Sequence, residues 1–411
     1  MNKWKEVRRI KNDTTRILRA FLLVFLTGAM VWESDTSFVS QKEYEWEWVI
    51  EPGSYEYVCF IADDFVAAEK TNGMWEIINV SEGNVLPGEY EAVGLCRDNL
   101  INIKRGGLWG YIDESGNSVI KEQFEDAYEF QENLAAVKSE HLWGFINCLG
   151  ERVIENQYDD VTSFREGMVA IKQNGKWGFI NAEGGVVVGC IFDSVRSFSE
   201  GLAAVEQNGK WGCINASGKI VVECVYDNLQ DFSEGMAAVK QDEKWGFINQ
   251  NGNIQIPLQF REVGNFSEGL AAVERNGKWA YIDKNNNIVI DYYFYDAGSD
   301  AGTVWVGAFH DGLAMVSRGT YCLIDDSGTK VFEDSDFFLT IADYDIARDL
   351  ITGYVYIDEA MKVKKYGLVG MDGSCRLEPV FDYISGIYEE YVLVSQYMEN
   401  GTLKDGVIRL I

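Results

Sequence analysis

The chain has 411 residues, which is too long for one small domain and suggests several domains or a repeat array. Hydrophobic residues make up 47% and proline occurs 4 times, a composition that excludes a disordered, linker-like polymer. Lys and Arg number 36 against 65 Asp and Glu, for a formal net charge of −29. A surface this negative repels phosphate backbones, so we expect no nucleic-acid partner.

Residues 1–32 have the layout of a signal peptide. A basic stretch precedes an apolar run at 20–32, and the small residues Thr27 and Ala29 suit a cleavage after Ala29. The run is shorter than the roughly 20 residues of a spanning helix. We therefore expect an exported protein, secreted or held in the cell envelope. An uncleaved leader would anchor it to the membrane, and a buried N-terminal helix is the remaining alternative.

Two aromatic series recur at a constant step of about 34 residues, a period typical of tandem-repeat folds. The first consists of Trp75, Trp109, Trp143, Trp177, Trp211, Trp245 and Trp279. The second consists of Phe130, Phe164, Phe198, Phe232 and Phe266. Because the two series are independent and stay in register, they indicate a tandem repeat through the middle of the chain.

One unit illustrates the local structure. Apolar runs at 202–207 and 210–215 flank Asn208-Gly209, the pair that favours a type I′ hairpin turn. After a second turn near Ser217, residues 220–226 are rich in β-branched side chains and predict a third strand. Each unit is therefore predicted to be a three-stranded antiparallel meander followed by a connecting loop, and the fold class is all-β.

Alternation within a strand predicts how the units associate. Trp177 and Phe179 share one face of their strand, while Gly178 and Ile180 share the other. A lone meander cannot bury both faces, so the units must stack. We predict an open solenoid or superhelix of about ten units, since propellers usually have four to eight blades of four strands. A β-propeller is the alternative.

The repeat divides the chain into four segments. Residues 1–32 form the signal peptide or N-terminal anchor, and 33–56 an acidic aromatic linker or cap. The regular array spans 57–330, and 331–411 hold degenerate repeats and a C-terminal cap. Towards the C-terminus Tyr replaces Trp, as in Tyr366-Gly367, which is typical of terminal units.

The strand Lys176-Trp177-Gly178-Phe179-Ile180-Asn181 and its copy at 244–249 resemble the WG-repeat family of bacterial proteins. The resemblance is close over residues 57–330 and weak beyond them. It implies a β-repeat architecture, often found in exported or multidomain proteins. It supplies no catalytic residues that could be transferred to this sequence.

Histidine and cysteine give no sign of catalysis. The two histidines, His141 and His310, fall at turn and loop positions of the repeat, and we expect both to be solvated. Without a buried histidine the usual Ser or Cys triad is missing. No cysteine pair has zinc-finger spacing. We therefore predict that the protein is not an enzyme, with no catalytic, cofactor-binding or metal-binding residue.

Three sets of residues have a structural and a functional interpretation. Glu166, Glu200, Glu234 and Glu268 are expected to be turn acceptors or solvated, with a cation-binding or docking stripe as the alternative. Cys190 and Cys224 occupy equivalent positions, so a disulfide between them is a hypothesis, while Cys213 is expected to be buried. The repeated Trp is expected in the core. Better candidates for exposed stacking are the irregular aromatics Trp46, Trp48, Tyr292, Tyr293, Tyr295 and Trp305.

These features favour a non-catalytic scaffold at the cell envelope that binds a protein through an extended repeat surface. The alternative is a module that binds carbohydrate or cell-wall glycan through aromatic side chains. An enzyme would need a unique site in the irregular C-terminal part.

Overall fold

The computed structural model describes residues 44–295, 306–317, 321–330, 338–345, 350–358, 363–370 and 374–411. The regular elements in these ranges are β-strands. No helix in the described part of the chain is long and apolar enough to span a membrane. The leader at 1–32 and Trp305 lie outside the described residues. The chain divides into two compact units: Tyr55–Asp334, and Met1–Ser54 together with Ser335–Ile411.

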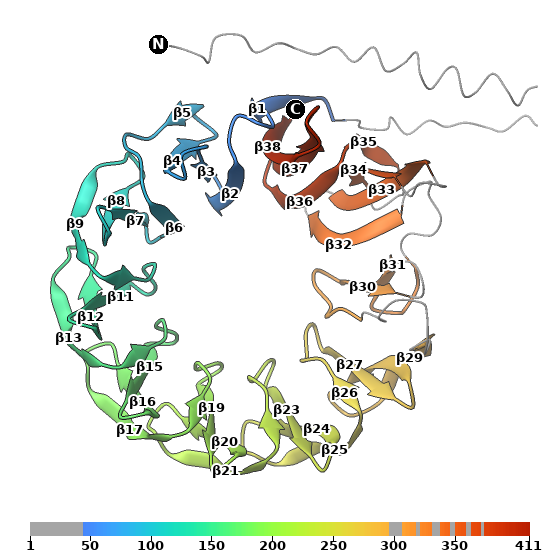
Figure 1. Ribbon diagram of the computed structural model, residues 1–411. Coiled ribbons are helices and arrows are strands. Elements are labelled where there is room, and N and C mark those ends of the chain that lie inside the picture. Colours follow the sequence, from blue (N-terminus) through green and yellow to red (C-terminus); the bar gives the residue numbers. More distant parts are fainter. Residues whose placement is uncertain are drawn as a thin grey trace, which may run out of the picture. The chain divides into compact units, whose positions relative to one another are not determined.

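The unit Tyr55–Asp334 is a succession of antiparallel sheets, seven of four strands and one of two among the described residues (Figure 1). The first three sheets are β2 (Tyr57–Ala62), β3 (Phe65–Glu69), β4 (Trp75–Asn79) and β5 (Asn84–Val85); β6 (Ala92–Arg97), β7 (Leu100–Arg105), β8 (Leu108–Asp113) and β9 (Ser118–Phe124); and β10 (Asp126–Ala127), β11 (Leu134–Ser139), β12 (Leu142–Asn147) and β13 (Arg152–Tyr158).

The remaining sheets of this unit repeat the same plan. They are β14 (Asp160–Val161), β15 (Met168–Gln173), β16 (Lys176–Asn181) and β17 (Val186–Phe192); β18 (Ser194–Val195), β19 (Leu202–Gln207), β20 (Lys210–Asn215) and β21 (Ile220–Tyr226); β22 (Asn228–Leu229), β23 (Met236–Gln241), β24 (Lys244–Asn249) and β25 (Ile254–Phe260); β26 (Glu262–Val263), β27 (Leu270–Arg275), β28 (Lys278–Asp283) and β29 (Ile288–Tyr295); and the pair β30 (Leu313–Ser317) and β31 (Tyr321–Asp325).

The repeats are four-stranded, so the prediction of a three-stranded meander is wrong. The extra strand comes from the segment read as a connecting loop. In β18, Ser194 and Val195 pair with Glu206 and Val205 of β19, and the amide of Asp193 extends the pairing by donating to Glu206 O at 2.9 Å. A strand of two residues is too short to show alternation in sequence, and it forms because β19 offers an open edge.

The hairpins form as the sequence predicts. Asn208 and Gly209 adopt φ values of 55° and 76°, the left-handed conformation that a type I′ turn requires. The expected second turn also forms, and Asn215 caps it by accepting hydrogen bonds from the amides of Ser217 and Lys219 at 3.1 and 3.0 Å. These short turns fix the register of each hairpin.

The glycine that follows five of the seven repeated tryptophans lies opposite a bulge. Between Trp177↔Phe192 and Phe179↔Val188 the register of β16 and β17 shifts, so extra residues of β17 lie opposite Gly178. A Cβ on Gly178 would stand 2.6 Å from Val188 O. The corresponding distances are 2.6 Å at Gly144 and 2.3 Å at Gly212. In these sheets the Trp-Gly pair thus permits a close approach of the two backbones, whereas β28 has Ala280 opposite the same register shift.

The hydrophobic core lies between successive sheets. The ring of Phe145 in β12 meets Phe164, which belongs to the next repeat, at a centroid distance of 5.0 Å. The same contact recurs for Phe179 and Phe198 at 5.1 Å. Ile180, on the opposite face of β16 from Phe179, is also buried. Both faces of a sheet are therefore covered by its neighbours, as the sequence predicts.

The second unit holds two further sheets. One consists of β32 (Phe338–Asp345), β33 (Leu350–Asp358), β34 (Val363–Val369) and β35 (Cys375–Phe381). In the other, β1 (Trp46–Ile50) pairs with β38 (Leu403–Leu410), followed by β37 (Tyr391–Tyr397) and β36 (Tyr383–Tyr388). Trp46 and Trp48 contact the ring of Phe381 at 5.3 and 5.9 Å. The segment expected as a linker or cap therefore contributes a strand to the C-terminal sheet.

The bulge predicts that Gly178→Ala lowers the free energy of unfolding by about 1–3 kcal/mol, because the added methyl group forces the carbonyl of Val188 away. Urea denaturation monitored by circular dichroism measures the change. The matched control is Ala280→Gly, since Ala280 occupies the same position in β28. That variant should lose less, about 1 kcal/mol or below. Equal stability of Gly178→Ala and the wild type would contradict the steric requirement.

Candidate functional site

Four successive repeats present a tight turn in which glutamate precedes glycine. We call the turns at Glu166-Gly167, Glu200-Gly201, Glu234-Gly235 and Glu268-Gly269 the Glu-Gly turns. In the second of them the Ser199 amide donates to Leu202 O at 2.8 Å, and the Leu202 amide returns a bond of 3.1 Å. Glu200 has a φ of 53°. These turns place one carboxylate per repeat in series.

The carboxylates of the Glu-Gly turns bind the backbone of the next repeat. Glu166 accepts hydrogen bonds from the amides of Glu200 and Gly201, both at 2.8 Å. Glu132 binds the amides of Glu166 and Gly167 in the same way, at 2.7 and 2.8 Å. The predicted role as turn acceptors is confirmed, with the addition that each glutamate serves its neighbour's turn. A carboxylate with two amide donors is well suited to this because it has two acceptor oxygens.

The serine that precedes the glutamate in three of the four Glu-Gly turns reinforces the link. Ser199 Oγ donates to Phe232 O and Ser233 Oγ to Phe266 O, both at 2.8 Å. The acceptors belong to the phenylalanine series whose rings fill the core. The Ser-Glu-Gly sequence therefore joins the polar rim of one repeat to the aromatic core of the next.

A second acidic series, which sequence reasoning missed, joins the repeats at another point. Asp193 accepts from the Asn208 amide at 2.9 Å and is paired with Lys176 of the preceding sheet. Asp227 pairs in the same way with Lys210 and the Asp242 amide. The lysine partners, and then the backbone amides, lower the pKa of both aspartates. The sequence contains a pattern that could have revealed these ion pairs, because Asp193 and Asp227 are one repeat apart and each follows a lysine at the same interval.

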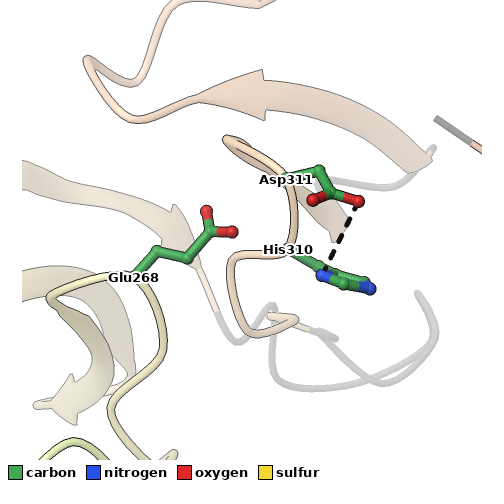
Figure 2. A group of neighbouring side chains, drawn as sticks. All are labelled: Glu268, His310 and Asp311. Carbon is green, nitrogen blue, oxygen red and sulfur yellow. Dashed lines mark ion pairs between the residues drawn. The ribbon is translucent and has the colours of Figure 1, made fainter. Parts of the chain in front are cut away.

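The series of Glu-Gly turns changes at its C-terminal end, where His310-Asp311-Gly312 replaces Ser-Glu-Gly (Figure 2). Glu268 Oε2 accepts from the Gly312 amide at 2.8 Å, so the link to the following turn is kept. His310 Nδ1 lies 3.9 Å from Asp311 Oδ2, and the two side chains are 72% and 63% exposed. One possible ligand atom from each of Glu268, His310 and Asp311 lies within 4.8 Å of the others.

The two histidines are exposed, as predicted. His141 occupies the hairpin turn after β11, with a φ of 66° and a side chain that is 92% exposed. Its Nδ1 lies 3.3 Å from Glu125 Oε2. His310 takes the position of Ser199 in its turn, and its amide donates to Leu313 O at 2.8 Å. What the sequence did not predict is that His310 stands beside two carboxylates.

The hypothesis of a Cys190–Cys224 disulfide is wrong, because both residues are free thiols. Each sulfur lies against a carbonyl of its own sheet: Cys190 Sγ is 3.7 Å from Ile171 O and Cys224 Sγ is 3.6 Å from Val205 O. Equivalent positions in neighbouring repeats thus do not bring the thiols together. Cys213 is buried as expected, and burial raises its pKa to about 11.

The repeated tryptophans pack against the core, and cationic side chains lie over several of their rings. Trp143 and Trp245 are buried, while Trp177 and Trp211 are partly buried. Lys172 Nζ lies 5.4 Å from the centroid of Trp177, and the Arg196 guanidinium 5.3 Å from that of Trp211. The ring faces are thus largely occupied.

The irregular aromatics give a mixed result. Trp46 and Trp48 are partly buried against the C-terminal core rather than exposed. The backbone of Tyr292, Tyr293 and Tyr295 belongs to β29, but their side chains lie outside the described residues, as does Trp305. No described aromatic from this group forms an exposed stacking platform.

Comparison with known proteins identifies the repeat. Residues 109–140, 143–177, 177–211, 211–245 and 245–279 match the model of the WG containing repeat. No curated protein matches the chain. A solved structure titled as a eukaryotic initiation factor aligns with a TM-score of 0.45 and 12% identity over 79% of this chain and 88% of that one. BamB from Moraxella catarrhalis aligns with a TM-score of 0.34 and 13% identity over 66% and 94% of the two chains.

The carboxylate links predict that Glu166→Gln weakens the array, because an amide has one acceptor oxygen where the carboxylate has two. We expect a loss of about 1 kcal/mol in the free energy of unfolding, limited by solvent screening. Chemical denaturation measures it, with Glu223→Gln on the exposed side of β21 as the matched control. Identical losses in the two variants would show that removal of charge, and not the link between turns, is responsible.

Proposed function

We propose, on the premise that residues 109–279 are WG containing repeats, that this chain is a non-catalytic scaffold that binds another protein at the cell envelope. The observation that carries the proposal is an exposed apolar row on the repeat array. Val186, Ile220, Ile254 and Ile288 stand at equivalent positions of successive repeats, and their exposed fractions are 71%, 44%, 54% and 51%.

The apolar row lies on strands that border solvent. Its four members open β17, β21, β25 and β29, which are edge strands of their sheets. In Figure 1 β17, β21 and β25 follow the outer side of the curved succession of sheets. Isolated exposed apolar side chains are ordinary, but a row at the repeat step is typical of an interaction surface. An extended row suits a partner that contacts several repeats at once.

The charge of the chain indicates the character of the partner. The chain has a formal net charge of −29. Association is therefore favoured with a partner whose apolar contact surface is surrounded by basic side chains. Such complementarity accelerates encounter and excludes acidic competitors. Binding should therefore weaken as the salt concentration rises.

Protein is favoured over glycan as the ligand by the state of the tryptophans. Carbohydrate stacking needs an open aromatic face, whereas Trp177 and Trp211 are partly buried beneath Lys172 and Arg196. Binding without chemistry is favoured by the carboxylates of the Glu-Gly turns, which recur in four successive repeats and are engaged with backbone amides. A repeated position of this kind does not supply one catalytic pair.

For the arrangement of the repeats, the sequence favours an open solenoid and keeps a closed propeller as the alternative. The pairing of β1 with β38 supports the propeller, because it unites the first described strand and the last strand of the chain in one sheet. An open stack has no need of such a pairing, whereas a closed array uses one to join its ends. Small-angle scattering of the intact chain separates the two, since a solenoid gives the longer maximum dimension.

A photo-crosslinking amino acid at Ile254 tests the protein-binding proposal. In the native host it should give one discrete protein adduct, and the additional substitution Ile220→Glu should reduce its yield at least several-fold. The control position is Glu243, which is 90% exposed in the same sheet and away from the row. Equal adducts from both positions would contradict a specific surface. Pelleting with purified wall polysaccharide, unaffected by Ile220→Glu, would favour the glycan alternative.

Envelope localisation rests on the leader at residues 1–32. Intact-mass analysis after expression in a bacterial host should give an exported protein that lacks about 29 residues, as expected for cleavage after a small-x-small site. Full-length protein in the membrane fraction would indicate an anchored array. Full-length protein in the cytosol would refute export and move the search for the partner into the cell.

A further inference from the structure

The last turn of the regular array brings together three side chains that can ligate a metal, from two successive repeats. Glu268 comes from the turn before β27, while His310 and Asp311 come from the turn before β30. One ligand atom of each lies within 4.8 Å of the others. In a tetrahedral site with bonds of about 2.0–2.2 Å, ligand atoms stand about 3.3 Å apart. His310 and Asp311 are largely exposed, so small rotamer changes close that difference.

This turn differs from the regular turns in its side chains and not in its backbone link. Glu268 holds the Gly312 amide through Oε2, as Glu200 and Glu234 hold the glycine amides of their next turns. Its Oε1 is the atom that it offers to a metal. A hydrogen bond of this kind to a ligating carboxylate fixes its orientation and is typical of metal sites. The serine and glutamate of the regular turn are replaced by an imidazole and a shorter carboxylate.

We propose that Glu268, His310 and Asp311 bind a divalent transition-metal ion of the Zn²⁺ class. One imidazole nitrogen and two carboxylates suit Zn²⁺, Co²⁺ or Ni²⁺, whereas Ca²⁺ takes six to eight oxygen ligands. Three protein ligands leave the remaining coordination to water. The ion neutralises two neighbouring carboxylates. It also links the repeat of β27 to that of β30, which are separated by the longest interval of sequence between repeats of the regular array. This site is independent of the proposed partner surface.

The two histidines make the test direct. Zn²⁺ is titrated into the full chain labelled with ¹⁵N at histidine, and the imidazole resonances are followed by NMR. The expected result is that the resonance removed by His310→Ala shifts near equimolar Zn²⁺, while that of His141 does not. His141 is the matched control because it is exposed and paired with one carboxylate, Glu125. Since metal binding needs a neutral imidazole, acidification should release the ion.

The affinity is then measured by isothermal titration with reduced protein. His310→Ala should lower the Zn²⁺ affinity at least tenfold and Asp311→Asn by a smaller factor, while His141→Ala leaves it unchanged. Because the eight cysteines also have affinity for Zn²⁺, Co²⁺ spectra of the same samples are recorded. Thiolate charge-transfer bands with unchanged affinity in His310→Ala would overturn the site and assign the metal to cysteine. An unmoved His310 resonance would overturn it as well.

Discussion

The contact between aromatic rings of successive repeats is the constraint on which the rest of this structure depends. A Phe or Tyr two residues after the tryptophan meets the phenylalanine of the following repeat at 4.8–5.1 Å in five sheet-to-sheet contacts. Each sheet has apolar residues on both faces, so none is stable without a neighbour on each side. The stability of each sheet therefore depends on its neighbours, and the repeated aromatic residues form the contacts between sheets.

The acidic composition follows in part from the same constraint. Glu166 and Asp193 belong to two series that hold backbone amides across repeat junctions, so many carboxylates satisfy turns whose donors have no strand partner. Lys176 and Lys210 pair with the aspartates Asp193 and Asp227, and within the glutamate series Lys284 pairs with Glu234. Part of the negative charge therefore belongs to carboxylates that hold the turns at the rim of each sheet. The apolar row of Val186, Ile220, Ile254 and Ile288 lies on the fourth strands and takes no part in these links.

Periodicity revealed the strands, the hairpin turns and the location of the core, because each depends on residues adjacent in sequence. Asn208-Gly209 identifies a turn by its φ requirement alone. The short first strand of the repeat escaped prediction since β18 has two residues and forms only against an existing edge. The Cys190–Cys224 hypothesis failed because equivalent positions stand one sheet apart, with each thiol directed to its own sheet. Glutamates in series were visible in sequence, but their acceptor role across repeats required the geometry.

Departures from the repeat carry information about function that the residues of the repeat junctions do not. A residue repeated for a structural reason is explained by the contact it makes, as Gly178 is by the bulge in β17 and Glu166 by the next turn. His310 and Asp311 are not explained in this way, since serine and glutamate satisfy the same turn elsewhere. His310 lies beside Glu268 at a junction whose backbone link is made by Glu268 and Gly312, and the proposed metal site accounts for its presence there. In an array of near-identical sheets, an exposed turn can carry side chains that bind a ligand without weakening the core.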